Sequence, residues 1–219
     1  MRVVHKPYVV LKKKANMDLN DEDIDPLNDR PLTSSTVRDV LSNPRWAYLL
    51  FELSIIGNQE TTPTVAELAD KLQLSPDTVS DDLDELVSRE AVRMASQSPP
   101  QYRSTGCWFY ADSWLELPDK ERVDYVPKQM FGAVGYGHID TSVPEFLDEY
   151  GYEPLHTATI MYRSVVLDEE SDYSFEEMHP NIPDADITSL RPAFRYAYGR
   201  LSEDPLYGEE YDIEYSTEQ

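Results

Sequence analysis

The chain has 219 residues, of which 42 are acidic and 19 are basic, and its formal net charge is −23. This balance argues against ordinary nucleic-acid binding, which depends on Lys and Arg contacts to phosphate. The single cysteine, Cys107, excludes an intramolecular disulfide, and no apolar run approaches the roughly 18 to 20 residues that span a bilayer. The N-terminal stretch lacks the apolar region of a signal peptide, so we expect a cytoplasmic protein without membrane contact.

Residues 1–33 are predicted to lie outside the folded core, as a basic segment followed by an acidic disordered linker. Residues 1–16 hold five basic side chains and no acid, whereas residues 17–29 hold six acids. Two interpretations stay open. Either translation starts at Met17, or the first sixteen residues form a basic arm that reaches along DNA.

From residue 35 onward, apolar residues recur with helical spacing. The stretch "TSSTVRDVLSNP" predicts a short helix. Asn43 and Pro44 have the residue types of an N-cap and a first helical residue for a longer helix, "PRWAYLLFELSIIG". Thr64 and Glu67 then form a capping box ahead of "VAELADKL". The pattern therefore predicts three consecutive helices.

A fourth helix is predicted after a short turn, with Ser75 as its N-cap and Pro76 as its first residue. The stretches "AVRMASQ" and "QYRSTGCWFYA" flank a turn at residues 98–100 and are typical of a β-hairpin. No acid occurs in the 21 residues between Glu90 and Asp112, although roughly one residue in five of the chain is acidic. The hairpin is therefore the least acidic part of an acidic chain.

These elements are similar in order and spacing to the ArsR and MarR types of winged helix-turn-helix transcriptional regulator, particularly the haloarchaeal ones. The resemblance is carried by "VLSNPRWAYLLFEL", "TVAELADKLQLSPDTVSDDLDEL" and "REAVRM", and it covers about residues 35–111. The excess of Asp and Glu over Lys also resembles haloarchaeal cytosolic proteins, which stay soluble in multimolar salt. At such salt the Debye length falls to about 3 Å or less. The negative net charge therefore indicates a high-salt environment and says little about what the protein binds.

The resemblance implies a homodimer on double-stranded DNA, with the second helix of the helix-turn-helix in the major groove and the hairpin wing on phosphates. Carried over position by position, the groove-facing residues are Ser75, Pro76, Asp77, Thr78, Ser80, Asp81 and Asp82. Contacts to the DNA backbone are expected from Arg45, Arg93, Tyr102 and Arg103, and Arg38 is an additional candidate.

The groove-facing helix departs from the family in its charge. Relatives usually carry Arg, His or Lys at the places of Asp81 or Asp82. An aspartate can accept a hydrogen bond from cytosine N4, so one is compatible with base recognition. The alternative is a winged-helix protein-interaction module whose acidic helix no longer binds DNA and faces a basic partner.

The predicted domains are a winged helix-turn-helix domain at residues 34–111, a mostly helical dimerisation or sensor domain at 112–202, and an acidic tail at 203–219. Helices are predicted in "PDKERVDYV", "VPEFLDEYG", "PLHTATIMYRSVVL" and "TSLRPAFRYAYGRL". The fold class is therefore mainly α with a small β-hairpin wing. A homodimer interface is predicted at the helix that carries Arg191, Arg195 and Arg200. A second hypothesis is an effector pocket lined by tyrosines between the domains, for an unknown small molecule.

The remaining motifs predict no cofactor and no enzymatic activity. The stretch "GAVGYG", residues 132–137, lacks the Gly-Lys-Ser/Thr ending of a nucleotide loop and is expected to be a flexible turn. His138, Asp140, His156 and His179 lack paired metal-ligand spacing, so no metal site is predicted and His156 is expected in the core. Cys107 is expected to be a small apolar filler rather than a thiol sensor.

Overall fold

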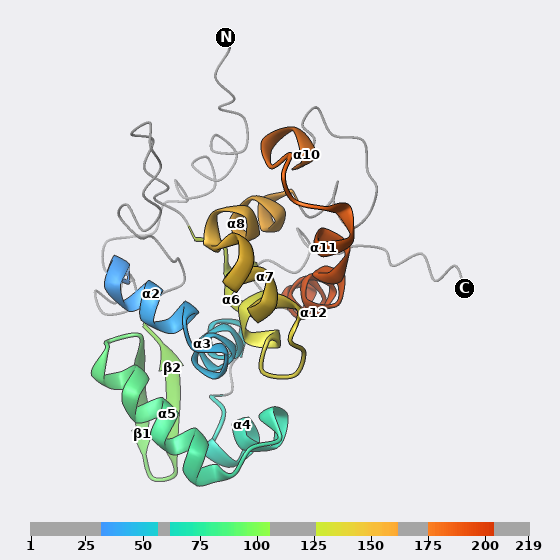
Figure 1. The fold of residues 1–219 in the computed structure, drawn as a ribbon. Helices are drawn as coiled ribbons and strands as arrows, with labels where there is room; N and C mark the ends of the chain where they lie inside the picture. Colours follow the sequence, from blue (N-terminus) through green and yellow to red (C-terminus); the bar gives the residue numbers. More distant parts are fainter. Residues whose placement is uncertain (1–31, 57–61, 106–125, 162–174, 204–219) are drawn as a thin grey trace, which may run out of the picture.

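The computed structural model describes residues 32–56, 62–105, 126–161 and 175–203. Within these ranges it contains ten helices and one two-stranded antiparallel sheet (Figure 1), which confirms a mainly helical fold with a small hairpin. The helices are α2 (Ser34–Leu41), α3 (Pro44–Ile56), α4 (Val65–Leu72), α5 (Pro76–Ser88), α6 (Lys128–Tyr136), α7 (Ser142–Tyr150), α8 (Tyr152–Ile160), α10 (Phe175–Met178), α11 (Asp184–Ser189) and α12 (Arg191–Ser202). None of these helices is long and apolar enough to cross a membrane.

The helix starts that were predicted from capping residues are confirmed. Asn43 Oδ1 accepts a hydrogen bond of 3.2 Å from the backbone N–H of Arg45, the second residue of α3. The side chain of Thr64 and that of Glu67 form a reciprocal capping box at α4. Ser75 caps α5, and Pro76 is its first residue. Because these side chains satisfy backbone N–H groups that have no partner inside the helix, each start is specified locally.

The hairpin consists of β1 (Val92–Gln97) and β2 (Pro100–Ser104). The two strands are antiparallel, and Arg93 lies directly opposite Arg103. An isolated antiparallel bridge joins Thr64 to Gln101, so the segment that leads into α4 lies against β2. The bridge therefore connects the start of α4 to the hairpin.

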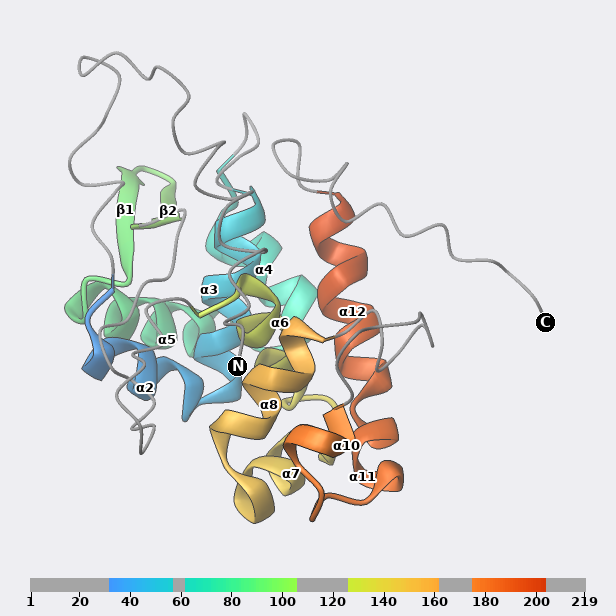
Figure 2. The same cartoon turned by 90° about the horizontal axis from the view of Figure 1, so that it is seen from above.

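Residues 132–137 do not form the flexible turn that was predicted. Residues 132–136 belong to α6, most of which is buried between α3 and α12 (Figure 2). A Cβ at Gly135 would lie 2.7 Å from the backbone N and Cα of Tyr48, and a Cβ at Gly132 would lie 2.8 Å from the ring of Phe51 and from Ala197. The prediction is wrong because these glycines allow close helix packing rather than a turn.

One cluster of buried apolar side chains extends from Leu32 to Leu201 and includes all the helices that flank α3. Every residue from 47 to 56 of α3 is buried, so this helix has no solvent face over that length. The two segments that were predicted as separate domains share this core. Their predicted boundary, between residues 111 and 112, lies outside the described residues.

The C-terminal helices follow the prediction in part. The stretch "VPEFLDEYG" is helical as α7, and α8 covers the first part of "PLHTATIMYRSVVL" up to Ile160. The stretch "TSLRPAFRYAYGRL" is divided between α11 and α12, because Pro192 has no N–H and disfavours continuation of the preceding helix. The prediction for "PDKERVDYV" lies outside the described residues, apart from Val126, which is not helical.

Glu52 of α3 is fully buried and is bound by three side chains, two from α12 and one from α4. Arg200 of α12 donates from Nε to Oε1 at 3.0 Å and from Nη2 to Oε2 at 2.8 Å. Lys71 Nζ of α4 lies 3.1 Å from Oε2, and the hydroxyl of Tyr196 donates to Oε1 at 2.8 Å. Burial alone would raise the pKa of Glu52, but Arg200, Lys71 and Tyr196 together hold it below its ordinary value. Arg200, predicted at a homodimer seam, thus pairs within its own chain.

Candidate nucleic-acid interface

Apart from Arg38 of α2 and Arg45 of α3, the predicted interface residues belong to α5, its N-cap and the hairpin. Figure 1 shows α4, α5 and the hairpin together at one end of the molecule. Helix α5 buries Val79, Leu83 and Leu86 in the core and turns its other side outward. In the view from above, the hairpin extends beyond α5 (Figure 2). One face of α5 and the hairpin therefore lie at the same end of the molecule.

The outward side of α5 carries the exposed carboxylates Asp77, Asp81, Asp84 and Glu85. Of the predicted groove-facing residues, Asp77 and Asp81 are thus accessible. Ser75 is also exposed, but its hydroxyl bonds to that of Thr78 at 2.8 Å. Thr78 and Ser80 are half-buried. The structure therefore leaves carboxylates, rather than hydroxyls, as the dominant groups on this face.

Asp82 does not face outward, so its predicted place on the groove face is wrong. It is 5% exposed, and its Oδ1 accepts hydrogen bonds from Arg45 Nη2 at 3.1 Å and from Trp46 Nε1 at 3.0 Å. The reason is helical geometry: Asp82 lies three residues after buried Val79 and next to buried Leu83. That spacing was the signal that should have placed Asp82 on the inner face.

Arg45 is held at the surface by this buried carboxylate. Besides the contact through Nη2, its Nε lies 2.9 Å from Asp82 Oδ2, and the Arg45 side chain is 42% exposed. A guanidinium has five N–H donors, and the paired geometry with Asp82 occupies one edge of it. Donors of Arg45 therefore remain available to a phosphate, with the plane of the group fixed by Asp82.

The hairpin places Arg93 and Arg103 side by side. Because they are directly opposite each other in the antiparallel register, their side chains share one face of the ribbon. Arg103 Nε donates to Thr62 Oγ1 at 3.0 Å, which anchors this arginine to the segment before α4. The hairpin therefore carries a pair of guanidiniums on one face.

Tyr102 lies on the opposite face of the hairpin from these arginines and is 3% exposed. Burial raises the pKa of its hydroxyl, and the charge of Asp84 adds to the rise. The predicted contact from Tyr102 to the DNA backbone is therefore corrected, because the Tyr102 ring is buried in the protein core. The alternation of a strand puts Tyr102 inward when its neighbour Arg103 points outward.

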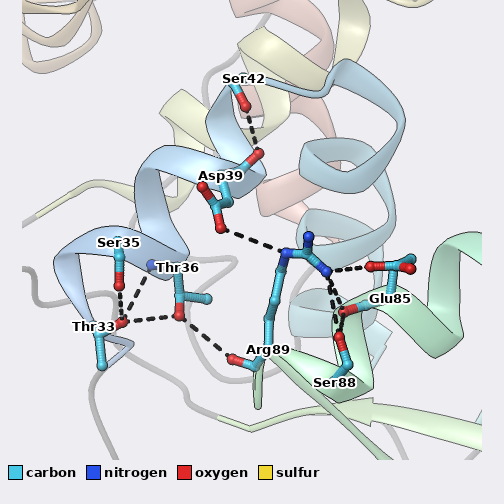
Figure 3. Close-up of polar contacts among 8 residues, drawn as sticks. All are labelled: Thr33, Ser35, Thr36, Asp39, Ser42, Glu85, Ser88 and Arg89. Atoms are coloured by element: carbon cyan, nitrogen blue, oxygen red, sulfur yellow. Dashed lines mark hydrogen bonds and ion pairs between the residues drawn. The ribbon is translucent and has the colours of Figure 1, made fainter.

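The contacts of Arg89, the C-cap residue of α5, were not predicted. Arg89 contacts the carboxylate of Glu85 and lies 3.5 Å from that of Asp39, and its guanidinium stands 4.4 Å from the centroid of the Trp46 ring. The backbone oxygen of Arg89 accepts a 3.4 Å hydrogen bond from Thr36 Oγ1 (Figure 3). The i, i+4 spacing of Glu85 and Arg89 was the signal that could have found it. Arg89 thus joins α2, α3 and α5.

The other candidate ligands do not form a centre. His156 is buried, as predicted for a core histidine, and His138 Nδ1 lies 2.6 Å from the backbone oxygen of Gly135. In the described ranges, no group of three or more His, Cys, Asp or Glu residues is placed to hold a metal ion. Cys107 lies outside those ranges.

Comparison with protein-family models and with curated proteins gives no match to this chain. The resemblance to winged helix-turn-helix regulators therefore stays a prediction.

Proposed function

We propose that this protein is a cytoplasmic DNA-binding transcriptional regulator with a winged helix-turn-helix fold, acting as a dimer on duplex DNA. The order α3, bridge at Thr64, α4, α5, β1 and β2 supports the proposal, since the bridge residue Thr64, just before α4, pairs with Gln101 of the hairpin that follows α5. The single observation that carries the proposal is the pair Arg93 and Arg103 on one face of a hairpin within an acid-free stretch.

The two arginines suit phosphate rather than base contact. Guanidiniums bind phosphate oxygens in a paired geometry, and a projecting hairpin can follow the DNA backbone while α5 lies in the major groove. Arg45 supplies a third guanidinium, oriented by Asp82 and exposed at the start of α3. Three contacts to the DNA backbone in each protomer then fix the position of α5 along the major groove.

The carboxylates of α5 repel the DNA phosphates at low salt, and this repulsion is weak at multimolar salt. Charges separated by more than about 3 Å are largely screened there, whereas hydrogen bonds in direct contact persist. Asp77 and Asp81, both exposed on α5, are then able to accept from cytosine N4, a contact that contributes about 1 to 3 kcal/mol of discrimination. The proposal therefore requires binding in concentrated salt.

The first test is selection of genomic DNA fragments on the purified protein in molar potassium chloride. The wild type is expected to enrich a two-fold symmetric site, and the Arg93→Ala, Arg103→Ala double variant is expected to lose it. Circular dichroism and the mass in solution establish that both proteins are folded and dimeric. Absence of enrichment by folded, dimeric wild type contradicts DNA binding.

Arg103→Ala is expected to weaken binding to all DNA sequences alike. Loss of one phosphate contact reduces the slope of log affinity against log salt by about 1. Fluorescence anisotropy with a labelled duplex over a series of potassium chloride concentrations measures it. Arg103→Lys is the matched control, since it keeps the charge and should keep the slope. A changed sequence preference at full affinity would mean that the hairpin reads bases instead.

Asp82→Asn is expected to weaken DNA binding to the same extent as Arg45→Ala, by about fivefold, because the amide no longer fixes the guanidinium of Arg45. The double variant should be no weaker than either single variant, since the two residues act as a unit. The same anisotropy titration gives the result. Independent, additive losses would show that Asp82 acts on DNA binding by another route.

The second candidate is a protein-interaction module that receives a basic partner on α5. It is favoured by the four exposed carboxylates of that face and by the engagement of Arg89 with Glu85 and Asp39. Failure of the DNA selection with folded, dimeric protein supports this candidate. Enrichment that depends on Arg93 and Arg103 contradicts it.

A further inference from the structure

The indole of Trp46, the third residue of α3, contacts side chains from α5 at two points. Its Nε1 donates to Asp82 Oδ1 at 3.0 Å, and the guanidinium of the C-cap residue Arg89 stands 4.4 Å from the centroid of its ring. We propose that Trp46 is a positioning residue, which fixes the Asp82 carboxylate and thereby the orientation in which Arg45 meets a DNA phosphate. The DNA part rests on the proposed function, whereas the positioning part does not.

The carboxylate of Asp82 receives two donors on one oxygen. Arg45 Nη2 donates to Oδ1 at 3.1 Å, where the indole of Trp46 also donates, and Arg45 Nε lies 2.9 Å from Oδ2. The torsion about the Cβ–Cγ bond of an aspartate is broad, so a carboxylate and the guanidinium bound to it can turn together. The indole N–H belongs to a rigid ring and is a donor only. It therefore fixes the plane of the carboxylate and, through it, that of the Arg45 guanidinium.

The Trp46 ring is itself held on its edge and on its face. Asp82 and Arg89 are seven residues apart, about two helical turns, so they lie on the same side of α5. Asp82 binds the edge of the indole, and Arg89 covers its face. Arg89 is in turn engaged by the carboxylates of Glu85 and Asp39 (Figure 3). The indole is therefore restrained from rotating away from Asp82.

Burial keeps this arrangement in place in concentrated salt. Asp82 is 5% exposed, and Nε of Arg45 is buried although the Arg45 side chain as a whole is 42% exposed. Salt screens buried pairs much less than exposed ones. A phosphate that reaches the exposed part of Arg45 then meets a guanidinium that is already oriented, so less conformational freedom is lost on binding.

The positioning role is tested by replacing Trp46 with 3-benzothienylalanine, an isostere in which sulfur takes the place of the indole N–H. The ring and its contact with Arg89 are kept, and only the donor to Asp82 is lost. The measurement is the ¹⁵N order parameter of the Arg45 Nε–H group, assigned with Arg45→Lys. We expect about 0.85 in the wild type, the value of a rigid group, and less than about 0.6 in the variant.

The Nε–H group of Arg103 is the internal control, because its partner is Thr62 Oγ1, at 3.0 Å, rather than Asp82. Its order parameter should be the same in both proteins, and their backbone amide spectra should agree. Three outcomes overturn the positioning role: a mobile Arg45 guanidinium in the wild type, one that stays rigid in the variant, or an equal loss of order at Arg103. Because no DNA is present, the result does not depend on the proposed function.

The DNA part is tested in the anisotropy titration with the labelled duplex. The 3-benzothienylalanine variant is expected to bind DNA about fivefold more weakly than the wild type, and to cause no further loss in an Arg45→Ala background, since the two residues act as a unit. Unchanged DNA affinity, or a loss that adds to that of Arg45→Ala, overturns the DNA part. A wild type that binds no DNA overturns the proposed function, and the loosening of Arg45 seen by NMR still supports the positioning role.

Discussion

Gly135→Ala is expected to destabilise the protein by about 2 kcal/mol, one of the two largest effects of a single change. The added methyl would lie 2.7 Å from the backbone of Tyr48, which cannot rotate away, so α6 must move off α3. Overpacking of this kind costs about 1 to 3 kcal/mol and occasionally more. The gain of about 1 kcal/mol in helix propensity offsets part of that cost.

Urea denaturation followed by circular dichroism measures the change at Gly135, and Gly132→Ala is the matched control. Its methyl would meet the ring of Phe51, which can rotate, and the Cβ of Ala197, which cannot, whereas at Gly135 both of the closest atoms belong to the backbone. We expect the smaller loss at Gly132. A loss at Gly135 equal to or below that at Gly132 would contradict the close approach of α6 to α3.

Glu52→Gln is expected to destabilise the protein by about 3 kcal/mol. The amide has the shape of the carboxylate but removes the charge that pairs with Lys71 and leaves Arg200 with Glu203 alone, and breaking a buried ion pair costs about 3 to 5 kcal/mol. We take the low end because both cations keep some contact with solvent. Glu145→Gln on the exposed surface of α7 is the control and should change stability by less than about 0.5 kcal/mol.

The effect of Glu52→Gln should depend on pH. The pKa of Glu52 is lowered in the folded protein, so its contribution to stability is fully present above the unfolded value of about 4.3 and is lost as pH falls through the lower folded value. The stability difference between wild type and variant is therefore expected to be constant near neutral pH and to shrink in acid below about pH 4. A difference that persists unchanged in acid would assign the effect to packing.

Local signals in the sequence predicted most of the first half of the fold. Asn43, Thr64 and Ser75 satisfy backbone groups within a few residues of themselves, and the hairpin turn is likewise a local feature. The apolar residues Leu190, Phe194, Ala197 and Leu201 of the predicted helical stretch are buried, because an amphipathic period is enough to define an inner face. Such features need no knowledge of what the helix packs against.

What the sequence did not reveal depends on contacts between distant segments. Gly132 and Gly135 have the composition of a turn, and only the approach of α3 explains them as helix. Asp82 and Arg45 are 37 residues apart, so their pairing has no local signature. The partner of Arg200 was sought in a second copy of the chain, whereas it is Glu52, 148 residues earlier. Charge alone did not show which aspartates of α5 face water.

The burial of residues 47–56 of α3 has a consequence for synthesis on the ribosome. Helix α6, which covers one side of α3, ends roughly 80 residues later in the chain, and α12 is later still. At about 5 to 20 residues per second, translation leaves this apolar surface uncovered for about 4 to 16 s. During that interval the nascent N-terminal half is exposed to aggregation, and a fragment that ends before α6 would remain in that state.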